Sequence, residues 1–258
     1  MSQDQMSPER AVIQEKPLLI IQLGRPPEDL VVTHGEQSDW MKQAIGGDTS
    51  MSVIRPHAGD SIPNPSEVAG AVLTGSWSMV TDREPWSELT AEWIRCAMQE
   101  RLPLLGICYG HQLMADALGG KVGFHASGRE IGQHEVRLDP KAFSDALFAS
   151  FPQKFQANLT HEQTVLKTPP GATVLASSAH DAHQIIRYSP EAISVQFHPE
   201  FNIDLMTACL VRRQDVFARE GYDIPEMVSS LRSTEYARAV LNDFAKNLRA
   251  GSLLGQPG

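Results

Sequence analysis

The stretch LGICYGHQL, residues 105–113, places a cysteine between two glycines where an apolar run changes into a polar, helix-forming segment. A Gly-x-Cys-x-Gly motif between a strand and a helix is typical of a nucleophile elbow. Glycine at Gly106 and Gly110 removes the β-carbons that would collide in so tight a turn. Cys108 is then expected to stand exposed above a sheet, close to the helix N-terminal amides that stabilise a thiolate. A buried cysteine beside helix-packing glycines is the alternative interpretation of this motif taken alone.

Short apolar runs and amphipathic stretches alternate around this motif. The runs predict buried strands at 17–24, 52–59, 70–76 and 103–108. The stretches predict helices at 35–47, 86–102 and 109–120. This alternation predicts an α/β fold with a mainly parallel central sheet flanked by helices. In the second helix, the spacing of Leu89, Trp93 and Cys96 predicts that Cys96 faces the core.

The second half of the chain differs in pattern. Short strands are predicted at 121–138, 155–165, 172–179, 184–189 and 192–197, as an antiparallel extension with the returning strands of the main sheet. Helices are predicted again at 205–220 and 235–250. No linker or repeat divides the chain. We therefore expect one domain over 17–200, a C-terminal helical extension over 201–258 and a disordered leader over 1–16.

Composition limits the classes of function. The formal net charge of −9 argues against nucleic acid and acidic membrane surfaces as partners. No segment is apolar for long enough to cross a bilayer, and the N-terminus lacks the apolar core of a secretory signal. The three cysteines, Cys96, Cys108 and Cys209, form no Cys-x-x-Cys pair. Disulfides and a zinc site are therefore not expected, and a reducing cytoplasm is the expected compartment.

Neither a metal nor a cofactor is expected. Four further histidines show no ligand spacing and are interpreted as surface or strand-edge residues: His125, His134, His180 and His183. No phosphate-loop pattern occurs in the sequence.

A second motif contains a candidate base for a thiol nucleophile and a carboxylate that could orient this base. In ISVQFHPE, residues 193–200, an apolar strand runs into His198, and Glu200 follows after Pro199. Proline fixes the backbone between them, so Glu200 could hold one nitrogen of the His198 ring while the other faces Cys108. A histidine at a strand end is by itself more often a surface residue. The two motifs together favour a Cys–His–Glu arrangement.

These motifs resemble the class I, or triad, glutamine amidotransferases. The similarity runs over about residues 17–200, and is greatest to the glutaminase domain of GMP synthases and to their stand-alone relatives, including plant γ-glutamyl peptidases. The resemblance implies a flavodoxin-like fold and a small-molecule substrate, glutamine or a γ-glutamyl compound. It implies Cys108 as the nucleophile that forms a thioester, His198 as general base and then acid, and Glu200 as the orienting carboxylate.

The resemblance also implies the rest of the site. The backbone N–H groups of Ser76 and Tyr109 would form an oxyanion hole. Residues expected to bind substrate are Gly75, Gln112, Thr160 and His161. Two positions depart from the family pattern: Ser76 replaces a glycine of the upstream loop, and Glu162-Gln163 replace a Gly-Asp pair, which puts the amino-acid substrate in doubt.

Three functions remain open at this point. The fifty-eight residues after Glu200 are too few for a synthetase domain. The chain could be a glutaminase subunit that passes ammonia to a separate synthetase, with Arg212-Arg213 on a docking surface. It could instead be a stand-alone hydrolase of γ-glutamyl amides or peptides. The third alternative, a non-catalytic binding relative, is disfavoured because Cys108, His198 and Glu200 are all present.

Overall fold

The computed structural model describes residues 16–47 and 49–249, so the predicted leader, apart from its last residue, lies outside the described residues. The strands are β1 (Leu18–Ile21), β2 (Met51–Ile54), β3 (Gly70–Leu73), β4 (Leu104–Ile107), β5 (Lys121–Phe124), β6 (Glu130–Leu138), β7 (Lys154–His161), β8 (Gln163–Lys167), β9 (Thr173–Ser177), β10 (Ile185–Arg187) and β11 (Ala192–Val195). The α-helices are α1 (Glu28–His34), α2 (Gln37–Ile45), α3 (Pro85–Gln99), α4 (Tyr109–Ala117), α5 (Ile203–Arg212), α6 (Gln214–Arg219), α7 (Ile224–Ser230) and α8 (Glu235–Arg249).

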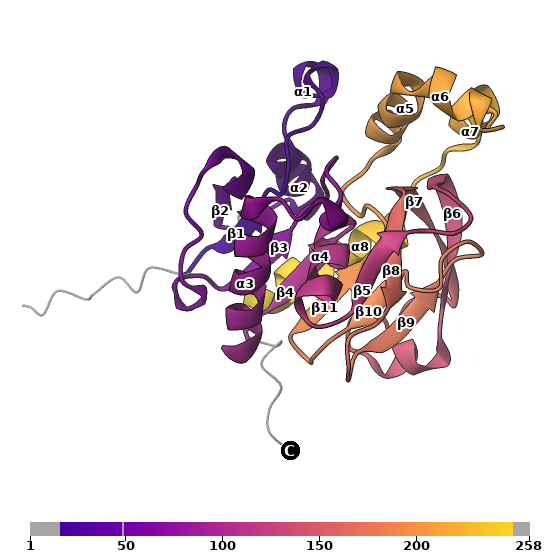
Figure 1. The fold of residues 1–258 in the computed structure, drawn as a ribbon. Helices are drawn as coiled ribbons and strands as arrows, with labels where there is room; N and C mark the ends of the chain where they lie inside the picture. The colour runs from indigo at the N-terminus through magenta and orange to yellow at the C-terminus, as the bar shows by residue number, and fades with distance from the viewer. Residues whose placement is uncertain (1–15, 48, 250–258) are drawn as a thin grey trace, which may run out of the picture.

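One large sheet runs through the described residues, in the order β2-β1-β3-β4-β11-β10-β9-β6-β7 (Figure 1). The strands from β2 to β11 are parallel, and those from β10 to β7 are antiparallel. β11 returns to the parallel part and pairs with β4, with Val195 opposite Ile107. β5 and β8 form a separate two-stranded sheet. The predicted mainly parallel α/β sheet is confirmed, and so is its antiparallel extension.

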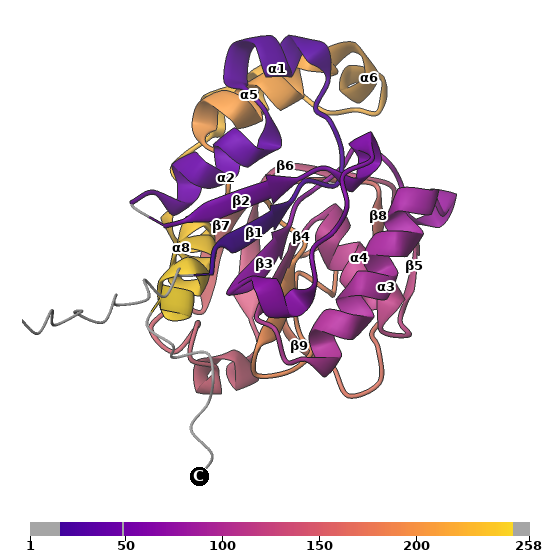
Figure 2. The same cartoon turned by 90° about the vertical axis from the view of Figure 1, so that its left-hand side faces the viewer.

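Helices cover both faces of the parallel strands, which explains the apolar sequences of β1, β3 and β4. Figure 2 shows α3 and α4 on one face and α2 and α8 on the other. In β1, Leu18 and Ile20 belong to one buried cluster, and Leu19 and Ile21 belong to the other. Successive strand residues point to opposite faces, so a strand buried on both sides needs apolar side chains at every position.

The last helix completes this core. The buried residues of α8 follow the spacing of a single helical face: Ala237, Val240, Leu241, Phe244 and Ala245. They pack into the same cluster as α2 and the sheet. α8 is therefore an integral layer of the fold.

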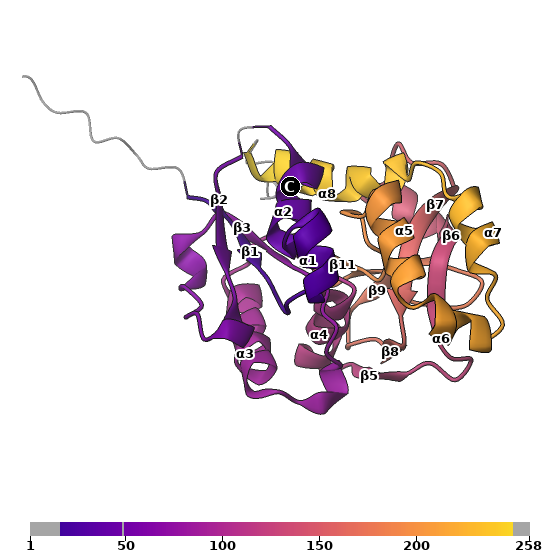
Figure 3. The ribbon, with the colours of Figure 1, turned by 90° about the horizontal axis from the view of Figure 1, so that it is seen from above.

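The helices α5 to α7 form a separate layer at one end of the sheet, as Figure 3 shows from above. The predicted helix at 205–220 is divided at Arg213, where α5 ends and α6 begins. α7 is not among the predicted helices. Its Pro225 occupies the first turn, where proline is tolerated. Phe201, Leu205 and Phe217 contribute to the apolar cluster beneath this layer.

The expected orientation of Cys96 is wrong. Cys96 is exposed, and Leu89 on the same predicted stripe is 63% exposed. The buried stripe of α3 runs through Trp93, Ile94 and Ala97, so Cys96 lies outside its 3.6-residue period. No helix in the described part of the chain is long and apolar enough to cross a membrane.

Candidate active site

The turn between β4 and α4 is a strained elbow. Cys108 has φ 50° and ψ −100°, a conformation that residues other than glycine rarely adopt. A β-carbon on Gly106 would lie 2.6 Å from the carbonyl oxygen of Gly110, and one on Gly110 would lie 2.5 Å from that of Leu73. Both contacts are prohibitively short, which confirms that the glycines are needed for close packing of the turn.

The cysteine is less accessible than the sequence predicts. Cys108 is only 5% exposed, so its sulfur does not stand free above the sheet. It faces a cavity instead, and its Sγ lies 4.0 Å from the carbonyl oxygen of Thr160. Residues from outside the elbow form the other walls of this cavity, including Trp77 after β3 and Arg213 and Phe217 from the α5–α6 layer.

The residues that follow three parallel strands lie at the same edge of the sheet. Ligands typically bind at this edge in open α/β folds. β3 leads to Gly75 and Ser76, β4 to Cys108, and β11 to His198. A β-carbon at Gly75 would lie 3.0 Å from Cε1 of His198 and 3.7 Å from Cβ of Cys108. Gly75 therefore leaves room for the imidazole. Gly75 is not among the residues that line the cavity, and its predicted contact with substrate stays a prediction.

His198 is held by contacts on several sides. Its Nδ1 lies 2.7 Å from Oε1 of Glu200, and its ring stacks on Phe201 with 4.1 Å between centroids. Its backbone N–H donates to the carbonyl oxygen of Asn158. Its Nε2 has no hydrogen-bond partner among the described residues. Thus one ring nitrogen is fixed by a carboxylate, and the other is available at the cavity shared with Cys108.

The electrostatics of this pair favour a protonated imidazole. Burial by itself would lower the pKa of His198, but the neighbouring charges of Glu200 and Cys108, together with the hydrogen bond to Glu200, outweigh it and raise the pKa to about 10. A positive charge on His198 favours a thiolate beside it.

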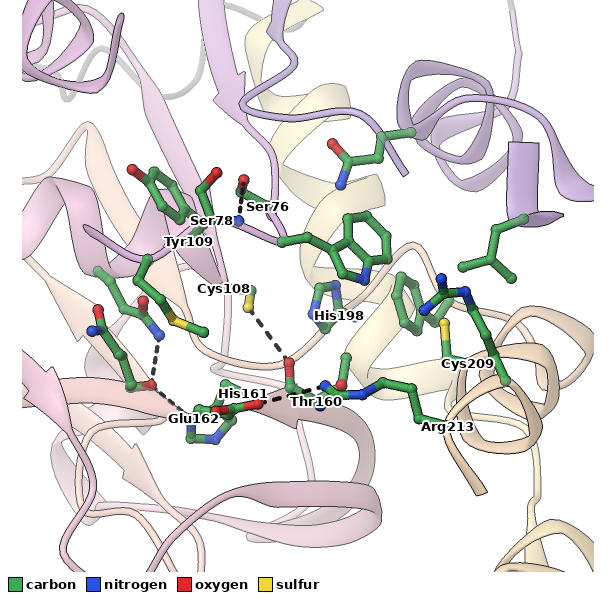
Figure 4. A pocket seen from close by; sticks show the side chains of 18 of the residues that line it. Ser76, Ser78, Cys108, Tyr109, Thr160, His161, Glu162, His198, Cys209 and Arg213 are labelled. Carbon is green, nitrogen blue, oxygen red and sulfur yellow. Dashed lines mark hydrogen bonds and ion pairs between the residues drawn. The ribbon is translucent and has the colours of Figure 1, made fainter. Parts of the chain in front are cut away.

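The cavity is partly open to solvent, and Figure 4 shows the side chains around it. Most of the predicted site residues meet there: Ser76, Cys108, Tyr109, Gln112, Thr160, His161 and His198. Glu200 supports the cavity from behind through His198.

The predicted oxyanion-hole residues, Ser76 and Tyr109, both lie above Cys108 in the view of Figure 4. Tyr109 is the first residue of α4, so its N–H has no acceptor within the helix. Its ring is buried away from the cavity, where the hydroxyl contacts Ser87 at 2.7 Å and burial raises its pKa to about 12. The Ser76 hydroxyl accepts the backbone N–H of Ser78. Trp77 is 40% exposed and lines the cavity, whereas the ring of Tyr109 belongs to the core.

Two of the predicted substrate-binding side chains are occupied by protein contacts. The amide nitrogen of Gln112 donates to the carbonyl oxygen of Gln163 at 2.6 Å and to Oε1 of Gln196 at 3.0 Å. The ring of His161 lies between Glu130 and the carbonyl oxygen of Gln163. Both side chains line the cavity and are held in place by hydrogen bonds to other residues of its wall.

Glu130 and the α5–α6 layer are parts of the site that the sequence does not predict. Glu130 is buried and lies directly opposite His161 in the β6–β7 pairing, so only the strand register brings them together. Arg212 and Arg213 line the cavity, and their predicted role on a docking surface stays a prediction. The break between α5 and α6 turns this segment over the site, and no local motif indicates it.

The scattered histidines form no site with the catalytic candidates. His125 and His180 stack with ring centroids 4.2 Å apart, and His134 contacts the carbonyl oxygen of Ile131. Over residues 16–47 and 49–249, no group of three or more His, Cys, Asp or Glu side chains is arranged to hold a metal ion.

Comparison with known proteins identifies the family of the chain. The family model described as glutamine amidotransferase class-I matches residues 47–214. The chain is 35% identical over 142 residues to a GMP synthase (glutamine-hydrolyzing) subunit from Methanocaldococcus jannaschii, covering 55% of this chain and 69% of that protein. It is 23% identical over 184 residues to γ-glutamyl peptidase 5 of Arabidopsis thaliana, covering 70% and 73%. It covers only 19% to 25% of three other proteins named GMP synthase (glutamine-hydrolyzing).

The fold is also shared. The crystal structure of a glutamine amidotransferase from Methylobacillus flagellatus matches with a TM-score of 0.67 and 25% identity, covering 95% of this chain and 98% of that one. The family model spans more than half of the chain and includes both the elbow and the His198 motif. The chain belongs to the class-I glutamine amidotransferases.

Proposed function

We propose that this chain hydrolyses the γ-amide of glutamine or of a γ-glutamyl compound through a thioester on Cys108. The observation that carries the proposal is the state of His198: Glu200 holds its Nδ1, and its Nε2 is unpartnered among the described residues, in the cavity that Cys108 lines. A nucleophile, a base and a group that orients the base are the parts required for thiol catalysis.

The reaction follows from these positions. The Cys108 thiolate attacks the γ-carbonyl carbon, and the N–H groups of Tyr109 and Ser76 stabilise the oxyanion. The C–N bond breaks as Nε2 of His198 gives its proton to the departing ammonia or amine. Water then loses a proton to His198 and attacks the thioester. The C–S bond breaks, free γ-carboxylate leaves, and the thiolate–imidazolium pair is restored.

The comparisons support two substrate classes. One similar protein is named as part of a glutamine-hydrolyzing GMP synthase, and another is named as a γ-glutamyl peptidase. In the first case ammonia would pass to a separate synthetase. In the second case water would resolve the thioester with no partner protein.

The experiment incubates the purified chain alone with glutamine and, separately, with γ-glutamyl dipeptides such as glutathione. Released ammonia and the released amino acids are measured, with Cys108→Ala as the control. Rapid, Cys108-dependent cleavage of dipeptides would identify a stand-alone hydrolase. Weak hydrolysis of glutamine alone would indicate a glutaminase that requires a synthetase partner. No turnover of either substrate by folded protein, or full activity in Cys108→Ala, would contradict the proposal.

A further inference from the structure

The junction between α5 and α6 places an arginine in the cavity. Arg213 is the C-cap of α5 and the N-cap of α6, so its backbone is fixed by both helices. Its guanidinium lies over the ring of Phe217, 5.2 Å from the centroid. The side chain is 38% exposed and lines the same cavity as Cys108. A planar cation is thus held at the wall of the candidate active site.

The polar contacts of Arg213 are weak. Within the described residues, its guanidinium makes one hydrogen bond, from Nη1 to Oε1 of Glu162 at 3.5 Å. Charge-assisted bonds of this kind are normally about 2.7–2.9 Å long. Arg213 therefore has N–H donors free for a ligand, although it lies next to a carboxylate.

The neighbouring charged side chains form shorter ion pairs than Arg213 does. Arg212, also on the cavity wall, pairs with Asp29 of α1 at 2.9 Å. Glu162 pairs closely with Arg129, which also binds Glu220 at 2.6 Å. Arg129 therefore takes the shorter contact with Glu162, and Arg213 keeps only the long one at 3.5 Å, which leaves its other N–H groups for an incoming anion.

Its position relative to the nucleophile suits a substrate group. Figure 4 shows the Arg213 side chain extending across the cavity to Glu162, with its guanidinium close to Thr160. The Thr160 carbonyl oxygen is 4.0 Å from Sγ of Cys108. Arg213 and Cys108 thus line one cavity and both lie near Thr160, so a single small molecule can contact both.

We propose that Arg213 is a specificity residue that binds a carboxylate of the substrate. The inference rests on the proposed function, because every such substrate carries an α-carboxylate, and γ-glutamyl peptides carry a second one on the departing side. The guanidinium fork matches a carboxylate in two parallel hydrogen bonds. Arg213 takes no part in the covalent steps.

The test compares substrates that differ in one carboxylate. Glutamine is paired with glutaminamide, which lacks the α-carboxylate, and γ-glutamylglycine is paired with γ-glutamylglycinamide. The wild type is expected to prefer the carboxylate member of one pair by about 10- to 100-fold in kcat/KM, mainly through KM. Arg213→Gln should abolish this preference, because it lowers kcat/KM only for the substrate that carries the carboxylate. The first pair would identify the α-carboxylate as the group bound, and the second pair the leaving-group carboxylate.

Two variants control for folding and charge. Arg213→Lys keeps the charge but loses the planar fork, so it should recover part of the preference. Arg219→Gln removes a cation from the exposed side of α6, outside the cavity, and should change neither pair. The proposal is overturned if Arg213→Gln lowers kcat/KM for all four substrates by the same factor, or changes it for none of them.

A failure of the proposed function can be recognised separately. If folded wild type turns over none of the four substrates, hydrolysis is contradicted. Calorimetry with Cys108→Ala protein then still decides the carboxylate contact, using all four compounds with Arg213 present and replaced. Equal affinity within both pairs in both backgrounds, or no binding of any of the four, would overturn the assignment of Arg213.

Discussion

Nδ1 of His198 and Oε1 of Glu200 lie 2.7 Å apart, and both side chains are almost completely buried. The contact fixes the orientation of the ring and directs the unpartnered Nε2 to the cavity of Cys108. A carboxylate that holds one histidine nitrogen orients the other and stabilises the positive charge of the ring. The two residues therefore affect the reaction to different degrees.

We expect His198→Ala to lower kcat by about 10³- to 10⁴-fold, because it removes the group that moves the proton. Glu200→Gln should be milder, at about 10- to 100-fold, because the amide oxygen still accepts from the ring while the charge is lost. Steady-state kinetics with glutamine or a γ-glutamyl dipeptide would measure both losses. Equal losses, accompanied by a lower Tm in Glu200→Gln, would instead show that Glu200 holds the local structure.

The stability of the fold should depend on pH through the same pair. The pKa of His198 is raised from 6.5 to about 10 in the folded protein. Its contribution to stability is therefore complete below pH 6.5 and is lost as the pH rises through about 10. We expect the free energy of unfolding, measured with urea, to fall between about pH 6 and pH 9.5. In Glu200→Gln the carboxylate that raises the pKa of His198 is gone, while burial still lowers it. The fall in stability should therefore be smaller in this variant. An equal fall in both proteins would contradict this origin.

The strain at the elbow gives a prediction that separates activity from stability. Cys108→Ala and Cys108→Gly should both abolish turnover, since both remove the sulfur. Glycine tolerates the φ of 50° at this position, whereas alanine does not. Cys108→Gly should therefore be more stable than Cys108→Ala by about 1 kcal/mol. Urea denaturation of the two variants measures the difference, and an alanine variant as stable as the glycine variant would show that the turn stores no strain.

The parts of the site that can be predicted from sequence lie within single short segments. The elbow depends on Gly106 and Gly110, whose β-carbons would meet backbone atoms within the turn or on the adjoining strand. The His198–Glu200 contact spans two residues across a proline. Because strand-ending motifs in a parallel sheet meet at one edge, two local patterns are enough to predict that Cys108 and His198 share a cavity.

The parts that cannot be predicted depend on tertiary geometry. The side of α3 that faces the core differs from the predicted one by a small rotation, which exposes Cys96. Arg213 enters the cavity because the chain breaks between α5 and α6, where no proline or glycine marks the break. Glu130 meets His161 through strand register alone.

Glu130 is the centre of a buried polar cluster behind the cavity wall. Its carboxylate accepts from the hydroxyl of Ser178 at 2.6 Å and from the amide of Gln184 at 2.9 Å, and it lies 3.0 Å from Nε2 of His161. The other ring nitrogen of His161 faces the carbonyl oxygen of Gln163 at 2.9 Å. Glu130 and the carbonyl oxygen of Gln163 thus hold the His161 ring from both sides.

Removing the charge of Glu130 should therefore destabilise the fold. We expect Glu130→Gln to lower the free energy of unfolding by about 2 kcal/mol, because an amide has one acceptor oxygen where the carboxylate has two, and buried hydrogen bonds to it are lost. Glu135→Gln is the matched control: it lies on the same strand, is exposed, and should change stability little. Urea denaturation at neutral pH measures both variants.

The pH dependence of this effect identifies its source. Burial would raise the pKa of Glu130, but the hydrogen bonds from His161 and Ser178 outweigh it and hold the pKa below its usual value of 4.5. The stabilisation is therefore present above pH 4.5 and is lost as the pH falls through the lower folded value. The stability difference between wild type and Glu130→Gln should shrink as the pH is lowered from about 6 to about 3. A difference that stays constant over this range would show that packing, and not the charge of Glu130, holds the cavity wall.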